Sequence, residues 1–95
     1  MHDPAATTAT ATLTLVCLAR LREALGTATE RLELPPAVTT VAELRVWLAA
    51  RGGAWATELA PGRAVRIAVN HDLARPDTPV RAGDEVALFP PVTGG

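Results

Sequence analysis

The last residues of the chain are of types that could support chemistry at a carboxyl group. A β-rich stretch ends at Phe89 and is followed by Pro90, Pro91, Val92 and Thr93, and then by the pair Gly94 and Gly95. Proline has no N–H for a sheet ladder and fixes its own φ, so the chain should leave the sheet as a stiff, extended tail. Glycine lacks a Cβ, so the final pair can enter a narrow slot and leaves its terminal carbonyl open to attack. The pattern predicts a domain whose reaction takes place on its own C-terminus.

Residues 88–95 resemble the tail of a known family, the small sulfur-carrier subunits of molybdopterin synthase in the ubiquitin-like MoaD/ThiS group. Residues 19–26, 69–70 and the G-D-E-V run at 83–86 also match the family pattern, and the resemblance covers roughly 13–95. A Gly-Gly end alone is a weak signal. Joined to F-P-P-V-x-G-G and to the G-D-E-V turn at this spacing, it is specific.

The resemblance implies a sulfur-transfer cycle at Gly95. A separate E1-like enzyme adenylates the carboxylate with ATP, sulfur from a persulfide displaces AMP, and Gly95 carries a thiocarboxylate. The large synthase subunit then uses that sulfur to convert cyclic pyranopterin monophosphate to molybdopterin, in an assembly of two small and two large subunits. Gly94 would thread through the partner's tunnel, with Pro90, Pro91, Val92 and Thr93 setting the direction of the tail.

The chain itself is not expected to be catalytic alone or to hold a cofactor tightly. It has no glycine-rich phosphate loop, so ATP would bind to the activating enzyme, and catalytic residues would lie in the large subunit.

Composition limits the class of protein. The chain has 95 residues, 48% of them apolar, which is enough for one small globular domain. A net charge of −1 without a basic run argues against nucleic-acid binding, and no apolar run is long enough for a membrane span. We see no secretory signal, and a single cysteine, Cys17, fits a reducing compartment, so we expect a cytoplasmic protein.

The elements that would hold the tail follow a β-β-α-β-β-β order. The pattern predicts strands at 13–19, 30–34, 63–69, 73–75 and 85–89, and short helices at 20–25 and 54–59. The main helix should start at a capping box formed by Thr40 and Glu43 and end near Arg51. We expect 1–12 to be a disordered extension and 13–95 to be an α+β, β-grasp domain: a mixed sheet of about five strands with one main helix on one face. The run at 13–19 is apolar enough for a strand covered on both faces. By resemblance, the first and last strands are parallel neighbours.

Alternation places an apolar group on the sheet face that the main helix does not cover. Its expected members are Val16, Leu18, Ala68, Ala87 and Phe89, with Leu73 at one rim. Such a face indicates a partner, although an ordinary apolar sheet face is the alternative. The resemblance implies that both the activating enzyme and the large subunit dock here.

Other candidate residues favour structural roles. Cys17 should be a core residue, the pair His71 and Asp72 a turn, and Asp84 with Glu85 a solvated turn and strand start, so no metal site is predicted. Trp47 and Trp55 should belong to the core. Alternative functions are a sulfur carrier for thiamine, tRNA thiolation or cysteine synthesis, a ubiquitin-like protein modifier, and a plain binding module.

Overall fold

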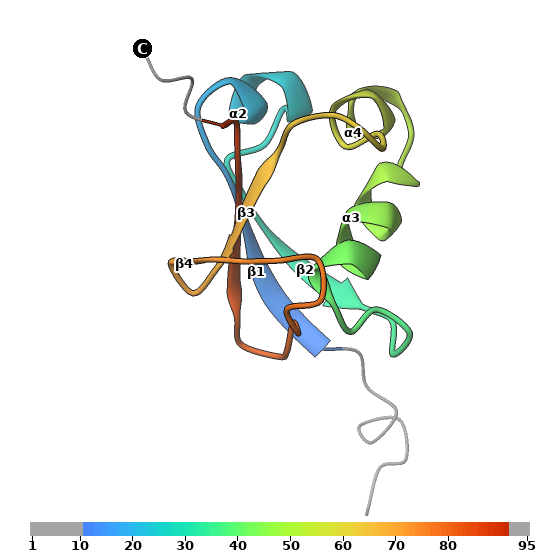
Figure 1. Cartoon of the computed structure of the whole chain (residues 1–95), viewed down its shortest axis with the longest axis vertical. Coiled ribbons are helices and arrows are strands. Elements are labelled where there is room, and N and C mark those ends of the chain that lie inside the picture. The colour runs from blue at the N-terminus through green and yellow to red at the C-terminus, as the bar shows by residue number, and fades with distance from the viewer. Residues whose placement is uncertain (1–10, 92–95) are drawn as a thin grey trace, which may run out of the picture.

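The computed structural model describes residues 11–91, which form a five-stranded sheet and three helices (Figure 1). The strands are β1 (Ala11–Cys17), β2 (Thr29–Leu34), β3 (Arg66–Val69), β4 (Asp72–Leu73) and β5 (Glu85–Phe89). The helices are α2 (Arg20–Leu25), α3 (Val41–Ala49) and α4 (Gly53–Glu58).

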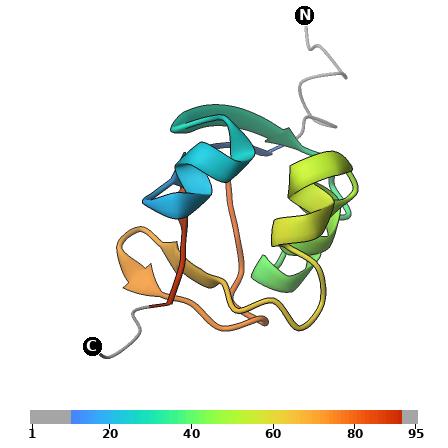
Figure 2. The same ribbon diagram turned by 90° about the horizontal axis from the view of Figure 1, so that it is seen from above.

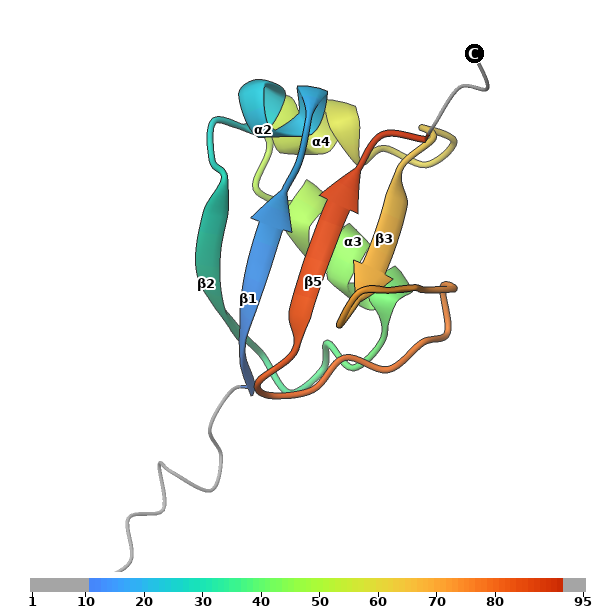
Figure 3. The same ribbon diagram turned by 90° about the vertical axis from the view of Figure 1, so that its left-hand side faces the viewer.

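The sheet is mixed and has the order β2-β1-β5-β3-β4. Strand β5 lies in the middle, parallel to β1 and antiparallel to β3, and Figure 3 shows these strands side by side with α3 behind them. The predicted parallel pairing of the first and last strands is therefore confirmed. So is the predicted fold class, an α+β β-grasp arrangement with the main helix on one face of a mixed sheet.

The core lies between the sheet and α3. Every second residue of β1 and β5 points into it: Leu13, Leu15, Cys17, Val86 and Leu88. The helices contribute Leu21, Leu25, Val41, Leu44 and Leu48. Among the described residues no polar or charged side chain is buried, so burial of apolar surface is the main term that stabilises this fold.

The start of α3 is fixed by the predicted capping box. The Glu43 N–H donates to Thr40 Oγ1 at 3.2 Å, and Glu43 Oε1 accepts from the Thr40 N–H at 3.1 Å. The same carboxylate oxygen accepts from the N–H of Thr39 at 2.8 Å and from its hydroxyl at 2.9 Å. The two hydrogen bonds from Thr39 are the main reason why the pKa of Glu43 lies below its ordinary value.

Strand β1 differs from the sequence prediction at both ends. It begins at Ala11, where Ala11 pairs with Leu34 and Thr12 with Glu33, so these two residues of the expected disordered extension belong to the strand, and residues 1–10 fall outside the described residues. It ends at Cys17 because Ala19 takes a positive φ of 54° before α2. The expected cover on both faces is also wrong: Thr14 and Val16 are half-buried, and Leu18 beyond the strand is exposed.

Strands β3 and β4 also differ from the prediction. Strand β3 starts at Arg66, three residues later than expected, and the edge strand β4 has only two residues. Asn70 and His71 between them both have positive φ, which is the type I′ hairpin pattern. The Asn70 amide donates to Asp84 at 3.0 Å and accepts from the Glu85 N–H at 3.0 Å, so the hairpin is tied to the turn before β5. Among the described residues, no helix is long and apolar enough to cross a membrane.

Candidate functional site

An apolar row crosses the sheet on the side away from α3. The Cα partners Val16–Ala87, Ala87–Ala68 and Ala68–Leu73 place four residues from four strands in one register. We call the surface formed by this row together with Leu18 and Phe89 the helix-free face; it is turned toward the viewer in Figure 3. The structure therefore brings together the five residues predicted to bind a partner: Val16, Leu18, Leu73, Ala87 and Phe89.

Exposure is uneven along the helix-free face. Leu73 is 60% exposed and Leu18 is 44% exposed, whereas Val16, Ala87 and Phe89 are half-buried. Ala68, which lies between Ala87 and Leu73 in the row, is only 7% exposed and adds little surface. The two leucines are thus the side chains with most apolar area left for a partner to cover.

The tail begins at one end of this face. Strand β5 ends at Phe89, which lies opposite Arg66 of β3, and the Leu18 N–H donates to the Leu88 carbonyl at 3.0 Å. Pro90 and Pro91 follow and are half-buried. Figure 2 looks down on this end, where α2 and the start of β3 lie beside the last residues of β5. The tail residues Val92, Thr93, Gly94 and Gly95 fall outside the described residues.

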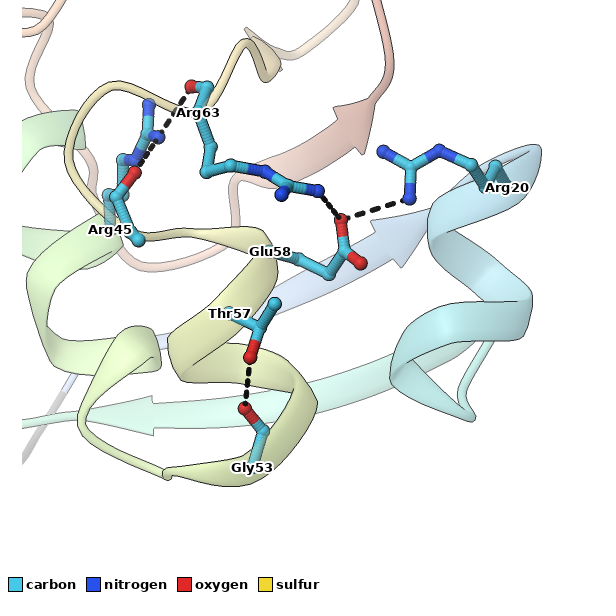
Figure 4. A network of polar contacts seen from close by, with 7 residues as sticks. Arg20, Arg45, Gly53, Thr57, Glu58 and Arg63 are labelled. Atoms are coloured by element: carbon cyan, nitrogen blue, oxygen red, sulfur yellow. Dashed lines mark hydrogen bonds and ion pairs between the residues drawn. The ribbon is translucent and has the colours of Figure 1, made fainter.

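An ion-pair network lies at the same end of the sheet (Figure 4). One oxygen of Glu58, at the end of α4, accepts from Arg20 at 3.0 Å and from Arg63 at 3.1 Å. The Glu58 side chain is only 13% exposed, and the bond from Arg20 is the first cause that holds its pKa low. This network links α2, α4 and the segment before β3. It lies at the end of the sheet where the tail leaves Phe89, which we call the root of the tail. Sequence reasoning missed this network, because Arg20 lies 38 residues before Glu58 and no periodicity signals the pairing with Glu58 and Arg63.

A second cluster, on the helix side of the sheet, shows that the two tryptophans pack against the core, as predicted, and also contact a cation. Trp47 and Trp55 are half-buried, and the Arg51 guanidinium lies 5.9 Å and 4.5 Å from their ring centroids. Arg51 also donates two hydrogen bonds to the Glu30 carboxylate, at 3.0 and 2.7 Å. The rings therefore pack against the core on one side and against a cation on the other.

The remaining candidates have structural surroundings. Cys17 is buried, and burial raises the pKa of its thiol to about 11, so the thiol is protonated and unreactive near neutral pH. His71 and Asp72 form the exposed hairpin, and Asp84 caps the turn by accepting from the Arg81 N–H at 2.7 Å. Within residues 11–91, no three His, Cys, Asp or Glu side chains are placed to hold a metal ion.

An open groove of about 520 Å³ lies on the helix side of the β3–β4 edge. Its lining is mainly apolar and includes Val41, Val46 and Ala49 of α3, Ile67 of β3 and Leu73 of β4. Leu73 therefore stands at the border between this groove and the helix-free face. Val46, 70% exposed, is on the groove side only.

Comparisons with known proteins agree with this geometry. The family model described as "ThiS family" matches residues 16–95. The molybdopterin synthase sulfur carrier subunit of Escherichia coli K12 is 44% identical over 77 residues, which cover 81% of this chain and 91% of that protein. The subunit of the same name from Haemophilus influenzae is 36% identical over 83 residues, covering 87% of this chain and 99% of that one.

A solved structure extends the likeness to the backbone. The crystal structure of small archaeal modifier protein 1 from Haloferax volcanii superposes with a TM-score of 0.70 at 26% identity, covering 86% of this chain and 99% of that chain. The family model spans the apolar row, the β3–β4 hairpin and the whole tail. The chain belongs to the ThiS family.

Proposed function

We propose that this chain is the sulfur carrier subunit of a molybdopterin synthase. The observation that carries the proposal is the position of Phe89, which is both the last residue of the central strand and a member of the helix-free face. A partner that covers this face holds the root of the tail. Such a partner thereby limits the positions that Gly95, six residues after Phe89, can occupy on its surface.

The reaction follows from the chemistry of a carboxylate. Its negative charge repels nucleophiles and oxide is a poor leaving group, so the Gly95 carboxylate must first be activated. Adenylation by an ATP-dependent enzyme makes AMP the leaving group, and the outer sulfur of a persulfide then displaces it to form an acyl disulfide. A second thiol reduces the S–S bond of this acyl disulfide, forms a disulfide with the donor, and leaves a thiocarboxylate on Gly95. ATP is bound by the adenylating enzyme.

The partners are the large subunit of the synthase and the adenylating enzyme. The name of the E. coli and H. influenzae relatives places them as subunits of molybdopterin synthase, and the helix-free face offers this chain a surface for such an assembly. In the large subunit, the thiocarboxylate would give its sulfur to cyclic pyranopterin monophosphate, and Gly95 would return as a carboxylate.

The test is the intact mass of the carrier after incubation with its adenylating enzyme, ATP and a sulfur donor. We expect a mass gain equal to the exchange of one oxygen for sulfur, located at Gly95 by fragmentation. The matched control lacks Gly95 and should keep its thermal midpoint but gain no sulfur. Sulfur on the truncated chain, or none on the full chain with an enzyme that loads another carrier, would contradict the proposal.

Protein modification is the second candidate function, because the Haloferax volcanii relative is named a small archaeal modifier protein. Both candidates need an activated Gly95, so loading alone does not separate them. Conversion of cyclic pyranopterin monophosphate to molybdopterin by loaded carrier and large subunit supports the first. Higher-mass conjugates joined through Gly95 to lysines of other proteins support the second.

A further inference from the structure

The charges of this chain are segregated along the direction of β5, although its net charge is only −1. The root end is where β1 and β5 finish and β3 begins, and it holds four arginines and two glutamates. Its net charge is therefore +2. These residues are Arg20, Arg22, Glu23, Glu58, Arg63 and Arg66.

The opposite end of the sheet is strongly acidic. It contains the starts of β1 and β5, the end of β2, the β3–β4 hairpin and the loop before β5, with six acidic side chains against three arginines, a net charge of −3. These residues are Arg31, Glu33, Glu43, Asp72, Arg75, Asp77, Arg81, Asp84 and Glu85. Arg51 and Glu30 neutralise one another, and Arg45 donates to the carbonyls of Leu59, Ala60 and Arg63, so the molecule carries a dipole whose positive end is the root of the tail.

Arg66 is the cation best placed to meet a partner at this end. It lies directly opposite Phe89 in the β3–β5 pairing, so its side chain belongs to the rim of the helix-free face. It is exposed and forms no ion pair with any residue from 11 to 91, whereas Arg20 and Arg63 share the Glu58 carboxylate. Arg66 therefore places a positive charge beside Phe89, the last strand residue before the tail.

We propose that the root end steers the carrier, tail first, into an entrance lined by acidic side chains on the large subunit. The inference rests on the proposed function, and it specifies the charge of the partner surface that surrounds the tail. A dipole of this sense raises the rate of productive encounters, because a carrier that approaches acidic end first is repelled. After docking, Phe89 and Leu73 hold the complex, so the charge acts on the association rate and little on dissociation.

The experiment measures association and dissociation rates of the carrier with its own large subunit by stopped flow, at several ionic strengths. Arg66→Glu should slow association about threefold or more at low salt and leave the dissociation rate nearly unchanged. Arg81→Glu is the matched control, because it makes the same change in net charge at the opposite end. The difference in association rate between the two variants should disappear at high salt, where the Debye length falls to about 3 Å and the charges are screened.

A reciprocal variant tests the sign of the effect. Glu58→Gln removes a negative charge from the root end and should speed association at low salt. Equal rates for Arg66→Glu and Arg81→Glu, or association that does not depend on salt, would overturn the steering inference while leaving the proposed function intact. No complex between the wild-type carrier and a large subunit that is active with another carrier would instead count against the proposed function.

Discussion

Leu73→Ala should weaken the complex with the large subunit without harming the fold. Leu73 lies on the two-residue strand β4, opposite Ala68, and is the most exposed apolar side chain of the helix-free face. Because 60% of it already faces solvent, shortening it removes few contacts within the domain. We expect the free energy of unfolding to change by less than about 1 kcal/mol.

The effect on binding can be sized from that exposure. Full burial of a leucine side chain contributes about 1.5–3 kcal/mol, and the fraction of Leu73 still open is 60%, so a partner that covers it gains about 1–2 kcal/mol. Truncation to alanine forfeits most of this gain. The dissociation constant should rise about 5- to 30-fold.

Titration calorimetry with the large subunit measures this change, and Val46→Ala is the matched control. Val46 is 70% exposed, also apolar, and lies on α3 at the groove side of the β3–β4 edge. We expect Val46→Ala to bind like the wild type. An unchanged dissociation constant for Leu73→Ala would refute the docking role of the helix-free face, and an equal loss for Val46→Ala would move the contact into the groove.

Three further predictions concern the fold around the site. Arg51→Ala should cost about 1–2 kcal/mol in urea unfolding near neutral pH, because it removes the bonds to Glu30 and the stacking on Trp55. Arg51 lowers the pKa of Glu30, so the difference from wild type should shrink as the pH falls through that lowered pKa; a constant difference would contradict the pairing. Cys17 should resist alkylation in the folded protein, and its raised pKa should make stability fall as the pH rises from about 9 toward 11, a slope absent in Cys17→Ala. Ala19→Gly should raise the thermal midpoint, because a φ of 54° suits glycine better than alanine; a lower midpoint would show that Ala19 is not strained.

The parts of the fold that sequence could predict are those encoded by local chemistry. Alternation identified the inward residues of β1 and β5, and the spacing of Thr40 and Glu43 predicted a cap that the hydrogen bonds confirm. The parallel pairing of β1 and β5 was not predicted from local chemistry. That prediction rested on the family resemblance. The start of β1 at Ala11 was missed because Ala11 and Thr12 were grouped with the Ala- and Thr-rich residues before them, whereas their pairing with β2 makes them part of the strand.

The clusters around arginine could not be predicted because they depend on tertiary contacts. Arg51 meets Glu30 across 21 positions of sequence, and Arg20 meets Glu58 across 38. No periodicity signals such pairs, so Trp47 and Trp55 were assigned to the core without the cation that covers them. The tail itself is the reverse case: its chemistry is read from residue types alone, and Val92 to Gly95 lie outside the described residues.

On the proposed function, recognition, stability and reaction depend on different residues in this chain. Stability rests on leucines and valines on the α3 side of the sheet, whereas the helix-free face uses side chains that the core leaves partly exposed. The two sets alternate along the same strands: Val86 and Leu88 of β5 are buried, and Ala87 and Phe89 between and after them face the other way. Because a strand separates its two faces so completely, the docking surface can be altered at Leu73 or Leu18 with little loss of stability. The rigid core would then hold Phe89 in place, so a carrier that docks poorly should still fold.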